Sequence, residues 1–231
     1  MQYVLVIDSG FGGATFVKTL HSKSNLNIIF YVENKLAPLG EKSKEELLNQ
    51  IKKIINKIKR KYEIKIVLFA CNTLTITCLY DVKQIFKNLI FFGTVPSDNK
   101  CENALILCTS LTAKNLNHIK NCKVVNLPKL ASLIDEFYPK KNEIKNYLKL
   151  MLKQEKDVKS VVLGCTHYCL VEKEIETVTK IKKIYNSKLQ VIKKILSLTK
   201  KINLVGNGKI YVTLSKKDEN FKNRLLNYIL L

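Results

Sequence analysis

The chain has 231 residues, of which 46% are apolar, and this length allows one large domain or two small ones with a substantial core. Its formal net charge of +21 raises the question of a nucleic-acid partner. Only Arg60 and Arg224 are arginines, however, whereas proteins that read bases and phosphates rely on arginine. We therefore expect a solvated, lysine-covered surface and no nucleic-acid partner.

The composition also bears on location and cofactors. No apolar run approaches the roughly 18 residues that a membrane-spanning helix requires, and the first residues lead straight into a strand without a basic leader. The sequence therefore favours a cytoplasmic protein with no membrane contact. Its seven cysteines should then be reduced thiols. Their spacing lacks the close pairs of a structural zinc site, so no metal is expected.

The first half of the chain alternates between apolar strands and amphipathic helices. Strands are predicted over residues 3–7, 27–32, 64–69 and 89–92. Helices are predicted over residues 14–20, 43–61 and 75–87, the second of them with the capping-box pattern of Ser43 and Glu46. Strands as apolar as these are typical of parallel sheets that helices cover on both faces.

The second half repeats this plan. Strands are predicted over residues 104–107, 124–127, 161–163 and 209–212, and residues 213–215 are interpreted as a turn. Helices are predicted after Thr112 and over residues 128–136, 142–154, 171–180, 188–201 and 219–230. Alternating strands and helices predict an α/β protein with mostly parallel sheets. No low-complexity linker separates the halves, so they should pack tightly and share a cleft.

Two of the predicted strands end in the same way. The sequence just beyond them reads Ala70-Cys71-Asn72-Thr73 and Gly164-Cys165-Thr166-His167. Ligands of open parallel sheets bind beyond the carboxyl ends of strands. One cysteine in this place is commonly a buried core residue, but two in the same context indicate a matched pair of reactive thiols.

The first strand runs into a glycine-rich turn that opens a helix. The turn reads Asp8-Ser9-Gly10-Phe11-Gly12-Gly13. Its glycines allow another group to approach the backbone closely, and the start of a helix favours an anion such as a carboxylate. The spacing is not that of the dinucleotide fingerprint. Asp8 is either a helix cap or a member of a site.

Five motifs now stand in a fixed order along the chain. They are Asp8-Ser9-Gly10-Phe11-Gly12-Gly13, Pro38-Leu39-Gly40, Ala70-Cys71-Asn72-Thr73, the pair Thr109 and Thr112, and Leu163-Gly164-Cys165-Thr166-His167. Together they resemble the cofactor-independent aspartate/glutamate racemase family, over nearly the whole chain. His167 is similar to the glutamate branch of that family, because the aspartate branch usually carries Glu there.

The resemblance implies an architecture and a reaction. Members have two pseudo-symmetric, three-layer α/β domains with the active site in the cleft between them. The first domain would comprise residues 1–93 and 190–231, and the second residues 94–189. The reaction would interconvert L- and D-glutamate, supplying D-glutamate for peptidoglycan, without pyridoxal phosphate or a metal. Its partner would be a small amino acid, and the chain could form a homodimer.

The resemblance also implies roles for individual residues. Cys71 and Cys165 would be the two catalytic thiols, one taking the α-proton as a thiolate and the other delivering a proton to the opposite face. Asp8 and His167 would assist the two cysteines. The residues that hold the substrate would be Ser9, Pro38, Leu39, Gly40, Asn72, Thr73, Thr109, Thr112 and Thr166.

The sequence departs from the family at four positions and leaves alternatives open. Leu39 stands where members usually have Tyr, Val95 where they have Glu, and Glu33 and Asn186 where they have Asp. The substrate could therefore be aspartate or another amino acid. A racemase-like binding protein with a basic surface is a third hypothesis, although such a protein would not need two opposed thiols.

Overall fold

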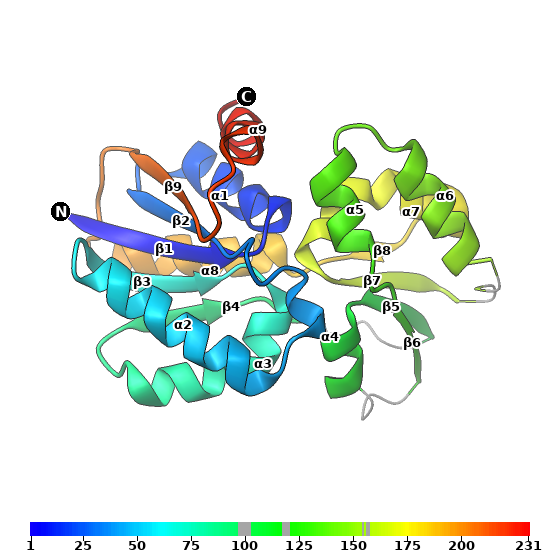
Figure 1. Ribbon diagram of the computed structural model, residues 1–231, viewed down its shortest axis with the longest axis horizontal. Helices are drawn as coiled ribbons and strands as arrows, with labels where there is room; N and C mark the ends of the chain where they lie inside the picture. The colour runs from blue at the N-terminus through cyan, green and yellow to red at the C-terminus, as the bar shows by residue number, and fades with distance from the viewer. Residues whose placement is uncertain (97–102, 117–120, 154, 156–157) are drawn as a thin grey trace.

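The computed structural model describes residues 1–96, 103–116, 121–153, 155 and 158–231. Its strands form two separate sheets that lie side by side, each with its own helices (Figure 1). The strand pairs in both sheets are parallel. This arrangement confirms the predicted α/β fold. No helix among the described residues is long and apolar enough to cross a membrane.

The first sheet has five strands in the order β4-β3-β1-β2-β9. They are β1 (Gln2–Asp8), β2 (Ile28–Val32), β3 (Glu63–Phe69), β4 (Ile90–Gly93) and β9 (Ile210–Leu214). β9 pairs with β2, placing Ile210 opposite Ile28. The last part of the chain therefore returns to the sheet with which the chain began.

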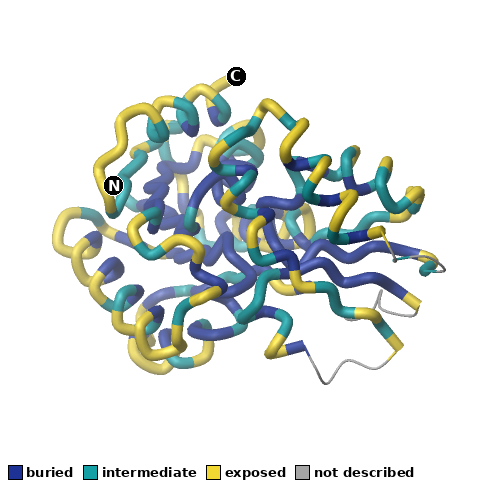
Figure 2. The backbone as a smooth tube through the Cα atoms, turned by 45° about the vertical axis from the view of Figure 1, so that its right-hand side comes forward, coloured by how far each residue is buried: buried dark blue, intermediate teal, exposed yellow. Residues whose placement is uncertain are grey.

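Helices cover both faces of this sheet because successive side chains of a strand point to opposite sides. Leu5 and Ile7 of β1 pack with one group of helices, and Val4 and Val6 pack with the other. The first group is α2 (Lys44–Lys59) and α3 (Asn72–Ile85), and the second is α1 (Phe11–Lys23), α8 (Lys188–Lys201) and α9 (Glu219–Leu230). The strands consequently lie in the buried interior (Figure 2).

The second sheet has four strands in the order β6-β5-β7-β8. They are β5 (Ala104–Cys108), β6 (Cys122–Asn126), β7 (Ser160–Gly164) and β8 (Ile184–Tyr185). One face packs on α5 (Leu130–Phe137), α6 (Asn142–Met151) and α7 (Glu172–Thr179). The other face is covered by α4 (Ser110–Asn115) and its following residue Leu116, together with Ile76 from α3. A helix that packs on the first sheet thus contributes to the core of the second.

The eight predicted strands are present, with several corrections at their ends and between them. Residues 213–215 are not a turn as predicted, because β9 continues to Leu214 and pairs there with Val32. β8 was not predicted, since two residues give no periodicity to detect. α1 and α3 begin three residues earlier than predicted, at Phe11 and Asn72. The glycines and polar residues after the strands resemble loop residues, but the chain is already helical there.

The chain passes between the two sheets after β4 and again between β8 and α8. The hydroxyls of Thr94 and Ser187 are hydrogen bonded to each other, which holds these two crossings together. The backbone N–H of Thr94 also donates to Thr75 Oγ1 at 3.1 Å. Away from the crossings, the turn after β1, the start of α3 and the short 3-10 helix η3 (Thr166–Val171) after β7 meet between the sheets.

Candidate active site

A small pocket lies where residues beyond the strand ends of both sheets meet. Its volume is about 30 Å³, enough for one or two water molecules. Nine predicted site residues line this inner pocket: Ser9, Pro38, Leu39, Gly40, Cys71, Thr73, Thr109, Cys165 and His167. A larger hollow of about 360 Å³, here called the outer pocket, adjoins it and shares Ser9, Ala37, Ser132 and Asp135.

Cys71 is the N-cap residue of α3 and lies two residues beyond the end of β3. Its side chain is only 8% exposed. Burial raises the pKa of the Cys71 thiol well above its usual value, and the negative charge of Asp8 raises it further. Backbone N–H groups of Thr73 and Leu74 act in the opposite direction without reversing the shift. Cys71 is therefore a protonated thiol at neutral pH.

Asp8 ends β1 and is completely buried between the sheets. Its Oδ1 accepts a hydrogen bond from the N–H of Gly10 at 2.8 Å, and its Oδ2 accepts one from the hydroxyl of Thr166 at 3.3 Å. Burial raises the pKa of Asp8 to about 6, although the charge of His167 opposes this shift. A carboxylate with that pKa exchanges protons near neutral pH.

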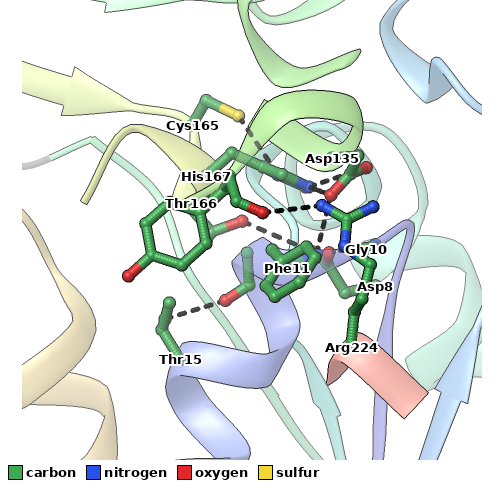
Figure 3. Close-up of polar contacts among 11 residues, drawn as sticks. Asp8, Gly10, Phe11, Thr15, Asp135, Cys165, Thr166, His167 and Arg224 are labelled. Atoms are coloured by element: carbon green, nitrogen blue, oxygen red, sulfur yellow. Dashed lines mark hydrogen bonds and ion pairs between the residues drawn. The ribbon is translucent and has the colours of Figure 1, made fainter. Parts of the chain in front are cut away.

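Cys165, His167 and Asp135 form a chain of contacts (Figure 3). His167 Nδ1 lies 3.8 Å from Cys165 Sγ, and His167 Nε2 lies 3.1 and 3.2 Å from the two carboxylate oxygens of Asp135. Burial lowers the pKa of His167, but Asp135 outweighs it and the net pKa is raised well above its usual value. A cationic imidazole beside a sulfur favours the thiolate.

Asp135 was not predicted as a site residue, because it belongs to an amphipathic helix that offers no sequence signal of function. The sequence does predict the group that binds Asp135, because the glycine turn at the start of α1 is expected to hold an anion. The N–H of Phe11 donates to Asp135 Oδ1 at 2.9 Å, and a side chain on Gly10 would collide with the same carboxylate. In the structure the anion at this turn is therefore a carboxylate of the chain itself.

Gly12 explains a second close approach at this turn. A side chain there would collide with Thr166 Oγ1 and His167 Nδ1. The glycines of the turn thus let η3 and α5, from the second sheet, press against the first turn of α1.

Three threonine hydroxyls join the two sheets on the other side of the inner pocket. Thr73 Oγ1 lies 3.0 Å from Thr109 Oγ1 and 3.3 Å from Thr112 Oγ1, and the last two are 3.2 Å apart. Asn72, which precedes Thr73 in α3, is buried, and its Nδ2 has no hydrogen-bond partner among the described residues. These groups can donate hydrogen bonds to a carboxylate.

Four predicted site residues do not line the inner pocket itself. Asp8 and Thr166 are buried against each other, Thr112 bonds to two lining threonines, and Asn72 lines a smaller cavity that also reaches Cys165. Within the described part of the chain, no three His, Cys, Asp or Glu side chains are grouped to hold a metal ion.

The chain is similar in sequence to curated glutamate racemases. No family model matches the chain. A glutamate racemase of Aliarcobacter butzleri is 31% identical over 237 residues, which cover 90% of this chain and 88% of that protein. A glutamate racemase of Clostridium acetobutylicum is 29% identical over 247 residues, which cover 96% of each chain.

Solved structures of the same kind share the fold. The glutamate racemase of Thermus thermophilus, in complex with β-chloro-D-alanine, matches with a TM-score of 0.85 at 19% identity, covering 99% of this chain and 93% of that one. The glutamate racemase of Francisella tularensis, in complex with D-glutamate, matches with a TM-score of 0.82 at 21% identity, covering 100% and 94%.

Proposed function

The chain belongs to the glutamate racemase family, and we propose that it interconverts L- and D-glutamate by moving the α-proton between the substrate and two thiols, Cys71 and Cys165. The observation that carries this proposal is that one cysteine from each sheet lines the same pocket. An α-carbon held between two sulfurs can lose a proton on one face and gain one on the other.

The charges around the two thiols suggest how a turnover begins. Cys165, beside cationic His167, starts as the thiolate and takes the α-proton, which breaks the Cα–H bond and forms an S–H bond. Cys71, held as a thiol, then gives its proton to the opposite face. The thiols have now exchanged their protonation states, and this is the state that acts on the opposite enantiomer.

Asp8 and His167 are proposed to let the two thiols exchange these states. Asp8 takes the proton of Cys71 when Cys71 must act as the base and returns it when Cys71 must be the donor, because its pKa of about 6 keeps it ionised at neutral pH but still basic. His167 supports the thiolate of Cys165, and Asp135 holds the imidazole ring in place and in its charged form. Each cysteine thus has one assisting group, from its own side of the cleft.

The substrate would be held by neutral donors. No lysine or arginine is among the described residues that line the inner pocket. The hydroxyls of Ser9, Thr73 and Thr109 line the pocket and would bind its carboxylates and ammonium group. The proposed contacts of Asn72, Thr112 and Thr166, which do not line the inner pocket, would form when the cleft opens. Pro38, Leu39 and Gly40 also line the inner pocket, and Gly40 lies against Thr109.

The substrate requires the cleft to open. Glutamate needs far more space than one or two waters, so the two sheets must separate before it binds at the inner pocket. The outer pocket adjoins the inner one at Ser9, Ala37, Ser132 and Asp135 and would be the route of access. The paired crossings at Thr94 and Ser187 would act as the hinge.

Several further features belong to this proposal. The two domains would be residues 1–93 with 190–231 and residues 94–189, a division that the membership of the strands in the two sheets supports. The protein would be cytoplasmic, would work without pyridoxal phosphate or metal, and would supply D-glutamate for peptidoglycan. A homodimer is its proposed assembly.

A racemisation assay on a panel of L-amino acids, followed by circular dichroism with no cofactor added, tests this function. We expect L-glutamate to lose its optical signal fastest, and at the same rate after exhaustive EDTA treatment. Faster racemisation of aspartate, or activity that depends on added pyridoxal phosphate or metal, would contradict the proposal.

A further inference from the structure

Arg224 of α9 lies where the two sheets meet, outside the chemistry described above. Its Nη2 donates a hydrogen bond to the backbone carbonyl of Tyr138 at 2.7 Å. Its guanidinium carbon is 5.3 Å from the ring centroid of Phe11 and 6.0 Å from that of Phe221. A planar cation stacked on aromatic rings is held in one orientation. Figure 3 shows Arg224 reaching from α9 to the Phe11 turn.

Two of the three groups that Arg224 contacts, Phe11 and Tyr138, are connected to Asp135. The N–H of Phe11 is the donor that binds Asp135 Oδ1. Tyr138 follows the end of α5, the helix that carries Asp135, and its own N–H donates to the carbonyl of Ile134. Arg224 therefore contacts both Phe11, whose N–H binds Asp135, and the residue at the end of α5, the helix that contains Asp135.

The rings around Arg224 make this a packed junction between the sheets. The Phe11 ring lies 5.6 Å from that of Tyr138, 5.8 Å from that of Phe221 and 5.7 Å from that of Tyr228. Three of these residues come from α1 and α9 of the first sheet, and Tyr138 comes from the second. Removing the guanidinium would take away the hydrogen bond from Arg224 of α9 to the Tyr138 backbone and loosen the junction.

His167 depends on the position of Asp135. The groups that face the ring are Asp135 from α5, Asp8 from β1 and the sulfur of Cys165 beyond β7, and Asp135 is the strongest of the influences that raise the pKa of His167. The two distances from His167 Nε2 to the carboxylate, 3.1 and 3.2 Å, leave little room before the hydrogen bonds are lost.

We propose that Arg224 is a positioning residue for the Cys165 half of the reaction. It holds Phe11 and the end of α5 so that Asp135 stays against His167 and keeps Cys165 ready to take the proton. The Cys71 half, which relies on Asp8, does not depend on it. This inference rests on the proposed racemase function.

The test must separate the two thiols, and racemisation itself cannot. The equilibrium constant between enantiomers is one, so kcat/KM is necessarily equal in both directions. Chloride elimination from 3-chloroglutamate avoids this limit. One thiolate takes the α-proton, the Cα–H electron pair forms a Cα–Cβ double bond, and chloride leaves with the electrons of the C–Cl bond. The second thiol takes no part.

The Cys71→Ser variant identifies which enantiomer Cys165 deprotonates, because only that enantiomer should still release chloride. We then expect Arg224→Ala to slow elimination from this enantiomer by about tenfold to a hundredfold, the loss typical of a group displaced by up to an ångström. Elimination from the other enantiomer should change far less. Arg60→Ala removes the chain's other arginine, at the end of α2, and should leave both rates unchanged.

A double-mutant cycle shows whether Arg224 acts through Asp135. In an Asp135→Asn background, adding Arg224→Ala should change elimination by less than about twofold, since the interaction it supports is already gone. If the alanine variant does not fold, Arg224→Lys takes its place under the same criterion of unequal loss, because Lys cannot reproduce the planar stacking.

Two results would overturn the proposal. Equal losses for both enantiomers would mean that Arg224 only holds the domains together or attracts substrate into the outer pocket, which it also lines. Unchanged rates for both would mean that it does neither. The unmodified protein is assayed first. If it does not racemise glutamate, the proposed function is wrong, and this result is distinct from a failure of the Arg224 proposal.

Discussion

The two cysteines occupy matching places at the ends of β3 and β7 but have opposite electrostatic surroundings. Each side chain is 8% exposed. Cys71 faces the anionic Asp8, which adds to the effect of burial and raises the pKa of its thiol, whereas Cys165 faces cationic His167 at 3.8 Å. The difference teaches that two equally exposed thiols can differ in the charge that each one faces, an anion beside Cys71 and a cation beside Cys165.

This asymmetry suits a resting enzyme in which one thiol accepts a proton and the other donates one. A racemase must also run backwards, so the same groups have to exchange roles in each cycle. The pKa of Asp8, about 6, places it within reach of such an exchange at neutral pH. The comparison therefore makes distinct predictions for the two sides of the cleft.

The largest effect is expected from removing either sulfur. Cys71→Ser and Cys165→Ser should each nearly abolish racemisation, because every turnover uses one thiolate and one thiol. Each variant should still eliminate chloride from one enantiomer of 3-chloroglutamate, and the two variants should prefer opposite enantiomers. Cys78→Ala, in the core between α2, α3 and the first sheet, is the control and should keep its activity. Full racemase activity in Cys71→Ser would refute the two-thiol mechanism.

Changes to the assisting groups should be milder and one-sided. Asp8→Asn and His167→Asn should each slow the elimination that depends on their own cysteine, by about 10²- to 10⁴-fold, the usual value of general acid–base assistance. His21→Asn, near the far end of α1, is the matched control for the imidazole. If Asp8→Asn instead speeds the reaction of Cys71, Asp8 acts only as a repelling charge and not as a proton acceptor.

The sequence predicted the strand ends well because that pattern is local. A buried strand followed by a small residue, a cysteine and polar groups is complete within about ten residues, and it placed Cys71 and Cys165 correctly at the ends of strands. The glycine turn after β1 also predicted a bound anion. The sequence did not identify the anion that binds this turn as Asp135, because Asp135 is 124 residues away from Phe11.

The remaining features depend on contacts between the sheets. Asp135 lies on a helix whose polar residues look solvent-facing, and only packing against Gly10 and His167 gives it a function. Likewise, the sequence identifies Arg224 only as one of two arginines and gives no indication of its role. The residue that it contacts, Tyr138, is 86 residues away. Periodicity describes one element at a time and carries no information on such pairings.

Stability should reveal the cost of keeping Asp8 buried. The pKa of Asp8 is raised from 3.8 to about 6, so the folded protein binds this proton more tightly than the unfolded chain does. The resulting stability is present below pH 4 and is lost as the pH rises through 6. At pH 7 the ionised carboxylate therefore costs about 3 kcal/mol.

Asp8→Asn should raise the free energy of unfolding in urea at pH 7 by up to about 3 kcal/mol, and this gain should disappear near pH 4. Asp218→Asn is the control, because Asp218 is an exposed cap of α9 that Asn replaces equally well. Asp8→Asn being less stable than the unmodified protein at pH 7 would show that the hydrogen bonds to Gly10 and Thr166 outweigh the burial of charge.

The asymmetry of the two thiols is tested most directly by their rates of alkylation. A brief pulse of iodoacetamide at pH 7, followed by mass spectrometry of the peptides, reports each thiolate separately, and the equal exposure of the two side chains makes the rates comparable. We predict that Cys165 reacts at least about tenfold faster than Cys71, because the thiolate is the reactive form. Equal rates, or faster modification of Cys71, would contradict the assignment of Cys165 as the resting proton acceptor.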